Sequence, residues 1–242
     1  MKIGVKLCLD ELRLLNILQD FDYIELGLKP PIRVNEVARL REIHKGDYVI
    51  HAPTEYYGLD IGSREKEKQS LKLIKASLKV ADVLGASIVI IHAGTGSLQQ
   101  AKKVLSKVRD ERVVIENMPV RGIKGEACVG YDVESIRELI GSRFALCLDI
   151  NHCVKASIEL GVEPLKLLLG FLELKPVMAH VADGRFSNPV DEHLHLGEGD
   201  YDLARLLKEV KNVPRLTLET PRWDEERYVE DLKYLHLLLR SL

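Results

Sequence analysis

The stretch FALCLDINH, residues 144–152, combines the two features that decide the fold of this chain. Its first five residues are apolar without interruption, as in a strand buried on both faces of a parallel sheet. A carboxylate, Asp149, ends the run, and His152 follows three residues later. The stretch SIVIIH, residues 87–92, is built in the same way and ends in His92. Both stretches predict buried parallel strands with an ionisable residue at the carboxyl end.

Eight short runs of this kind recur along the chain, and they cover residues 2–7, 23–27, 48–51, 87–92, 113–116, 144–149, 177–181 and 215–219. Between them, apolar residues follow one another at helical spacing, as in Leu71, Ile74 and Leu78. Eight strand–helix units in 242 residues predict a single α/β domain over residues 1–242, a (β/α)8 TIM barrel. A doubly wound open sheet is the alternative, although such sheets usually have fewer strands.

The composition excludes several classes of protein. The chain is 46% hydrophobic and has a formal net charge of −2, which excludes intrinsic disorder and nucleic-acid binding by bulk positive charge. It has no apolar run long enough for a signal peptide or a membrane span. Its four cysteines form no C-x-x-C pair, as is usual in a reducing compartment. We therefore expect a cytoplasmic protein without membrane contact, and no protein partner is indicated.

Six consecutive predicted strands end on a histidine or a carboxylate, namely His51, His92, Glu116, Asp149, His180 and Glu219. In a parallel barrel these side chains meet at one mouth, the C-terminal face where barrel enzymes carry their active sites. One such residue is more often structural than functional, but six together need a compensating positive charge. A divalent metal ion supplies that charge, and imidazole with carboxylate suits zinc or manganese. The sequence therefore predicts a metal site at the C-terminal mouth.

Three further residues are expected to join this mouth. His152 lies in the first turn after Asp149, and Asp191 and His193 form a D-x-H pair in the loop after the seventh strand. Residues two apart in an extended loop face the same side, so this pair can bind one ion together. The mouth loops also carry candidate substrate contacts, namely Tyr57, with Tyr56 as an equal alternative, Arg185, Arg222 and Trp223. Guanidinium groups suit phosphate, and an aromatic ring can stack on a base or a sugar.

The chain resembles the endonuclease IV (AP endonuclease family 2) and xylose isomerase-like TIM-barrel superfamily. The matching stretches are YVIHAP, IVIIHAG, VVIENMP, FALCLDINH, VMAHVADG, VDEHLHLGEGD and LTLETP, which follow one another in the family's order from about residue 47 to residue 221. The resemblance to endonuclease IV implies up to three zinc ions. Their ligands would be His51, His92 and Glu116 for the first; Glu116, Asp149, His180 and Glu219 for the second; and His152, Asp191 and His193 for the third.

The implied activity is zinc-dependent hydrolysis of a phosphodiester at an abasic or damaged site in DNA, with Glu116 and Glu219 essential for catalysis. The same superfamily contains isomerases and epimerases that use one divalent metal ion, Mn2+ or Mg2+, on a small sugar or sugar phosphate. In that alternative Glu116 and Glu219 act as acid and base, and His51 and His92 contact the substrate. A third alternative is a non-catalytic barrel that binds a metal or a ligand.

Overall fold

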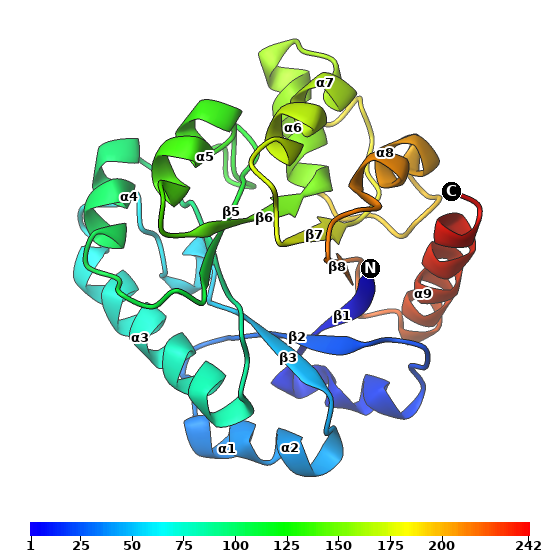
Figure 1. Ribbon diagram of the computed structural model, residues 1–242, viewed down its shortest axis with the longest axis horizontal. Coiled ribbons are helices and arrows are strands. Elements are labelled where there is room, and N and C mark those ends of the chain that lie inside the picture. Colours follow the sequence, from blue (N-terminus) through cyan, green and yellow to red (C-terminus); the bar gives the residue numbers. More distant parts are fainter.

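The computed structural model describes residues 1–242 and contains a closed barrel of eight parallel strands in sequential order (Figure 1). The strands are β1 (Lys2–Cys8), β2 (Tyr23–Gly27), β3 (Asp47–His51), β4 (Val89–His92), β5 (Val113–Glu116), β6 (Ala145–Asp149), β7 (Met178–Val181) and β8 (Arg215–Leu218). The predicted TIM barrel is confirmed. Each strand lies within one or two residues of its predicted bounds, and Glu219 directly follows β8.

Helices surround the barrel on its outer side (Figure 1). They are η1 (Leu9–Asn16), α1 (Val34–Ala38), α2 (Leu40–Ile43), η2 (Glu55–Tyr57), α3 (Glu67–Leu84), α4 (Leu98–Leu105), α5 (Val133–Ile140), α6 (Ile150–Leu160), α7 (Pro164–Leu172), α8 (Leu203–Val210) and α9 (Glu225–Arg240). Several begin at an acidic N-cap, as α5 does at Asp132, whose side chain accepts a hydrogen bond from the Ser135 amide. No helix is both long enough and apolar enough to cross a membrane.

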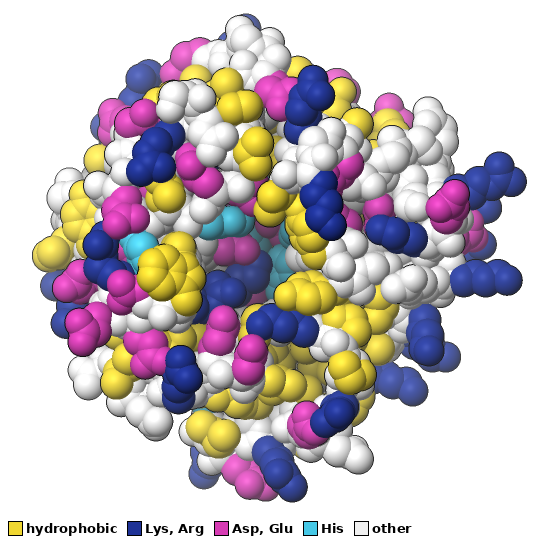
Figure 2. All heavy atoms as spheres, turned by 180° about the vertical axis from the view of Figure 1, so that it is seen from behind, with side chains coloured by type: hydrophobic (Ala, Val, Ile, Leu, Met, Phe, Trp, Pro, Cys, Tyr) yellow, Lys and Arg dark blue, Asp and Glu magenta, His cyan; other side chains and the backbone are white.

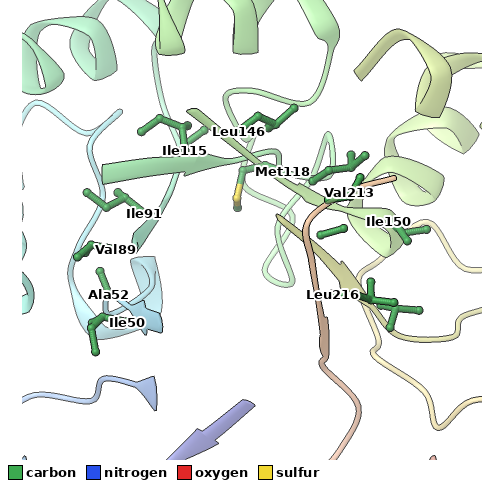
Figure 3. Close-up of a cluster of buried hydrophobic side chains, with 14 of the residues drawn as sticks. Ile50, Ala52, Val89, Ile91, Ile115, Met118, Leu146, Ile150, Val213 and Leu216 are labelled. Atoms are coloured by element: carbon green, nitrogen blue, oxygen red, sulfur yellow. The ribbon is translucent and has the colours of Figure 1, made fainter. Parts of the chain in front are cut away.

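The apolar side chains of the strands divide between two cores. Those that point outward, such as Ile50, Ile91 and Leu216, pack under the helices (Figure 3). Those that point inward form a separate buried cluster inside the barrel, to which Val49 and Ile90 belong. Because successive side chains of a strand point to opposite faces, the continuous apolar runs are needed to fill both cores.

The alternation of side chains along each strand also determines which residues lie above the inner apolar cluster. On every strand, the residue two positions beyond an inward-facing one is ionisable. These residues are Lys6, Glu25, His51, His92, Glu116, Asp149, His180 and Glu219. At this level some neighbouring strands are in register, as His92 is opposite Glu116 and Asp149 is opposite His180. Others are offset by two residues, as His51 is opposite Ile90. The barrel therefore brings eight ionisable side chains into one layer at its C-terminal mouth.

The inner cluster beneath this layer contains one aromatic ring, that of Tyr23. A Cβ atom on Gly4 would lie 2.3 Å from the ring of Tyr23, so the ring can cross the barrel only because position 4 lacks a side chain. The Tyr23 hydroxyl lies 2.8 Å from Oγ1 of Thr217 on β8. This contact joins β2 to β8 over the intervening strand β1 and satisfies a buried polar group.

Helix α9 joins the first and last strands through one hydroxyl group. Tyr228 is buried, and its hydroxyl accepts a hydrogen bond of 3.1 Å from the Lys6 amide. It also lies 3.1 Å from the Lys6 carbonyl and 3.3 Å from the Leu218 carbonyl. Removing the hydroxyl would leave these backbone groups without that partner in a dry environment.

We expect Tyr228→Phe to lower the free energy of unfolding by about 1–3 kcal/mol, the cost of leaving buried polar groups unsatisfied. Tyr234 lies on the same helix but is exposed, so Tyr234→Phe should change it by less than about 0.5 kcal/mol. Chemical denaturation of both variants measures the difference. Equal effects of the two substitutions would show that this hydroxyl does not help to close the barrel.

Candidate metal centre

A hollow opens near the centre of the face seen in Figure 2, and histidine, acidic and basic side chains gather in it. A cavity of about 160 Å³ lies in this mouth. Part of its lining comes from Thr54, Glu55 and Tyr56 at η2, and another part from Met118, Pro119, Gly122 and Ile123. The remaining polar lining consists of His92, His152, Asp191, His193 and Glu219. Five predicted site residues therefore border one small space.

The first group of possible ligands contains His51, His92 and Glu116, whose donor atoms all lie within 4.8 Å of one another. Nε2 of His51 lies 3.1 Å from Oε2 of Glu116. Nε2 of His92 lies 3.5 Å from the same oxygen. The three side chains come from consecutive strands, β3, β4 and β5, so the register of the barrel brings them together.

The second group contains Glu116, Asp149, His180 and Glu219, again with donor atoms within 4.8 Å of one another. Nδ1 of His180 lies 3.1 Å from Oε1 of Glu116, 2.7 Å from Oε2 of Glu219 and 3.7 Å from Oδ2 of Asp149. The other oxygen of Asp149 caps helix α6 by accepting a hydrogen bond of 2.6 Å from the His152 amide. Capping leaves Oδ2 turned toward the group.

The third group contains Asp149, His152 and His193, and Asp191 lies against it. Oδ2 of Asp191 is 3.3 Å from Nε2 of His152 and 3.3 Å from Nδ1 of His193. Nε2 of His193 is buried and has no hydrogen-bond partner. All nine predicted metal ligands therefore lie in or against these three groups.

Four of the imidazoles are oriented by an acceptor at one ring nitrogen, which leaves the other nitrogen facing the groups. The acceptors are the Ala52 carbonyl for His51 (2.8 Å), Glu55 for His92 (3.0 Å), the Asn117 carbonyl for His152 (2.9 Å) and Glu25 for His180 (2.9 Å). Histidines that bind metal ions are usually held by such a hydrogen bond at the second nitrogen. The donor set of imidazoles and carboxylates, oriented in this way, fits zinc.

The electrostatics show how strongly these groups depend on positive charge. Burial alone would raise the pKa of Glu116, but the imidazoles of His180 and His92 outweigh it and hold the pKa well below its usual range. Burial opposes protonation of His180, yet Cys147 and Glu25 raise its pKa well above the usual range. The pKa of His152 is also well above its usual range, because Asp149 and Asp191 outweigh burial. In the metal-free chain, protons on these imidazoles offset the buried carboxylates.

The loop between β7 and α8, which carries Asp191 and His193, is held by buried side chains. Nζ of Lys155 donates to the Asn188 carbonyl (2.7 Å) and to Oε1 of Glu192 (2.9 Å). Asn151 donates to Asp191 from the first turn of α6. His193 adopts a φ of +40°, in the left-handed region. A strained residue of this kind persists only where its surroundings hold it in place, as this loop does.

The four predicted substrate contacts lie outside the lining of the cavity. Tyr57 is exposed, whereas its neighbour Tyr56 lines the wall. Arg222 is partly buried and donates to Glu11 (2.8 Å). Arg185 is exposed and lies 3.6 Å from Glu192. Trp223 is 80% exposed, with its ring 6.1 Å from that of His195, so stacking of a base or sugar on it stays a prediction.

Sequence reasoning missed three charged side chains beside the groups: Lys6, Glu25 and Glu55. Lys6 and Glu25 interrupt the apolar runs of their strands. An unpaired charge inside a buried strand is costly, so this pattern indicates that each residue has a charged partner. Glu55 lies in η2 and gave no such signal.

Comparison with known proteins gives matches over most of the chain. The family described as "Xylose isomerase-like TIM barrel" matches residues 18–238. The endonuclease 4 of the bacterium Thermus thermophilus is 32% identical over 218 residues, which are 81% of this chain and 77% of that protein.

Two solved structures are similar over the whole chain. A D-tagatose 3-epimerase-like protein has a TM-score of 0.77 at 20% identity, and covers 100% of this chain and 99% of its own. Endonuclease IV from Thermus thermophilus has a TM-score of 0.73 at 24% identity, with 100% of both chains covered. These two structures share the fold of this chain while their names state different activities.

The raised pKa values of His152 and His180 predict how pH affects the metal-free protein. Their stabilising charge is complete below the unfolded pKa of about 6.5 and is lost as the pH rises through the higher folded pKa. The lowered pKa of Glu116 acts at the other end, since its contribution is lost only as the pH falls below about 4.3. We therefore expect the melting temperature in chelator to fall as the pH rises above about 6.5.

Zinc takes the place of these protons, so adding it should remove most of that fall. Differential scanning calorimetry measures both conditions. His180→Gln should flatten the pH dependence in chelator. His236→Gln, at a partly buried histidine on α9 that bonds the Asp20 carbonyl rather than a carboxylate, should leave it unchanged. The same slope for His180→Gln as for the unaltered protein would contradict this account.

Proposed function

Because this chain belongs to the xylose isomerase-like TIM-barrel family, whose similar proteins include endonucleases and epimerases, we propose that it is a zinc-dependent phosphodiester hydrolase acting at abasic or damaged sites in DNA. Two findings support the proposal. The curated relative at 32% identity is named endonuclease 4. The mouth of the barrel also offers donor atoms for more than one metal ion.

The observation that carries the proposal is the environment of Glu116. Its Oε2 faces the imidazoles of His51 and His92, and its Oε1 faces the imidazole of His180. A carboxylate whose two oxygens face separate imidazole sets is suited to bridge two metal ions. A site for one ion would need only the second group, and would leave His51 and His92 turned toward Glu116 without a ligand role.

The side chains of the mouth would have different roles in the proposed reaction. Zinc, when bound, activates water for attack and offsets negative charge on a phosphate group. Glu116, Asp149 and Glu219 would hold the ions in fixed positions. The walls formed by Tyr56 and Ile123 would limit the space above them and exclude bulk water.

Two observations favour the second candidate, an isomerase or epimerase acting on a small sugar or sugar phosphate. The four side chains Glu116, Asp149, His180 and Glu219 form a complete ligand set for a single Mn2+ or Mg2+ ion. In addition, the connection after β1 leads directly into η1, and only six residues separate β2 from α1, so the early loops add little surface for gripping duplex DNA. The two candidates differ in the number of metal ions and in the role of His51 and His92.

Metal content separates the candidates. We expect the purified protein, loaded with zinc and dialysed, to hold close to three zinc ions per chain, because the three groups supply three donor sets. His51→Gln combined with His92→Gln should lower the content by about one ion, measured by atomic emission. A single ion per chain, unchanged in this double variant, would support the isomerase instead.

Incision of a DNA duplex that carries one abasic site is the direct functional test. We expect the zinc-loaded protein to cleave it, and Glu116→Gln or Glu219→Gln to lower the rate by about a thousandfold or more, because each removes a carboxylate that holds the ions. Glu209→Gln is the matched control, since Glu209 lies beside Val177 and Pro214 at the opposite end of the barrel. Failure of the loaded protein to cut, together with proton exchange on ketoses or aldoses, would overturn the proposal.

A further inference from the structure

Two charged side chains on the first strands lie against the second group of ligands. Nζ of Lys6 on β1 is 3.4 Å from Oε1 of Glu25 on β2. Glu25 is fully buried and Lys6 nearly so. The pair is electrically neutral as a whole, so it adds no net charge to the mouth. A buried ion pair is costly to desolvate, which makes its presence beside the ligands a feature to explain.

Glu25 determines which nitrogen of His180 faces the mouth. Its Oε2 accepts a hydrogen bond of 2.9 Å from Nε2 of His180, and another of 2.8 Å from Oγ1 of Thr217. Thr217 thereby fixes the carboxylate in place. With Nε2 engaged in this way, Nδ1 is the nitrogen left to face Glu116, Asp149 and Glu219.

Lys6 determines in the same way which oxygen of Glu219 faces the second group. Its ammonium group forms an ion pair with Oε1 of that carboxylate. The second oxygen, Oε2, is left 2.7 Å from Nδ1 of His180. The Lys6–Glu25 pair therefore engages Nε2 of His180 and Oε1 of Glu219. The remaining donor atoms, Nδ1 of His180 and Oε2 of Glu219, lie close to each other.

We propose that Lys6 and Glu25 are positioning residues, which hold His180 and Glu219 with one donor atom each aimed at the second metal position. The proposal rests on the metal centre described above, but not on the number of ions in it. The second group is the one that both candidate functions require. The pair acts through the two ligands and contacts no reacting atom.

The test replaces both charges at once, because removal of Lys6 alone would leave the buried Glu25 and Glu219 carboxylates without the ammonium group that lies beside both. Lys6→Met combined with Glu25→Met conserves much of the volume and removes the acceptor for His180. We expect zinc to dissociate from one site roughly 10 to 100 times more readily, the usual effect of losing a partner of a metal ligand. Competition with a chromophoric zinc chelator measures it, and the visible spectrum of bound Co2+ should change as well.

A conservative variant distinguishes positioning from packing. Lys6→Met combined with Glu25→Gln restores an acceptor for Nε2 of His180 without restoring a charge, so it should recover part of the lost affinity. Asp60→Asn is the matched control, since Asp60 is also a buried carboxylate but bonds Thr95 and Gly62 rather than a predicted ligand. It should leave zinc affinity unchanged.

The outcomes separate this proposal from the proposed function. A fall from three tightly bound ions to two supports both. A fall from one ion to none supports the positioning role and contradicts the three-zinc site. Zinc affinity and Co2+ spectrum unchanged in the folded Met–Met variant, as judged by circular dichroism, would overturn the positioning role, whatever the number of ions.

Discussion

The structure depends on one constraint, the placement of eight ionisable side chains in a single enclosed layer of the barrel. Parallel strands in register leave no choice about where the inward residue at the carboxyl end of each strand lies. In this chain that residue is ionisable on every strand. Four are carboxylates, three are imidazoles and one is an ammonium group. Burial of so many carboxylates is tolerable only if positive charge lies within a few ångströms of them.

The source of the positive charge that offsets the buried carboxylates differs from one side of the barrel to the other. On the side of β1 and β2 it is built into the chain, since Lys6 lies between Glu25 and Glu219. From β3 to β7 it comes from imidazoles, which can carry either a proton or a metal ion. Three divalent ions would turn the slightly negative chain into a positively charged one, which is compatible with an anionic substrate. The net charge of the chain alone therefore does not exclude an anionic substrate.

The sequence was enough to predict the barrel and most of the ionisable layer, because β3 to β7 end at or next to the inward residue, as at His51 and Glu116. Strands β1 and β2 continue for two residues beyond theirs, so Lys6 and Glu25 lie inside strands and were overlooked. The cavity walls were harder to predict. Tyr56 rather than Tyr57 lines the cavity, because the single 3-10 turn η2 directs the two side chains differently. Arg222 is engaged by Glu11, a contact 211 residues away in sequence.

The central claim is that Glu116 bridges two metal ions in a centre of three. Anomalous diffraction at the zinc absorption edge, from crystals grown with zinc, tests it most directly. The account predicts three peaks, of which one lies between Glu116 and the pair His51 and His92, and another between Glu116 and His180. A single peak among Glu116, Asp149, His180 and Glu219, with His51 and His92 free of metal, would contradict it.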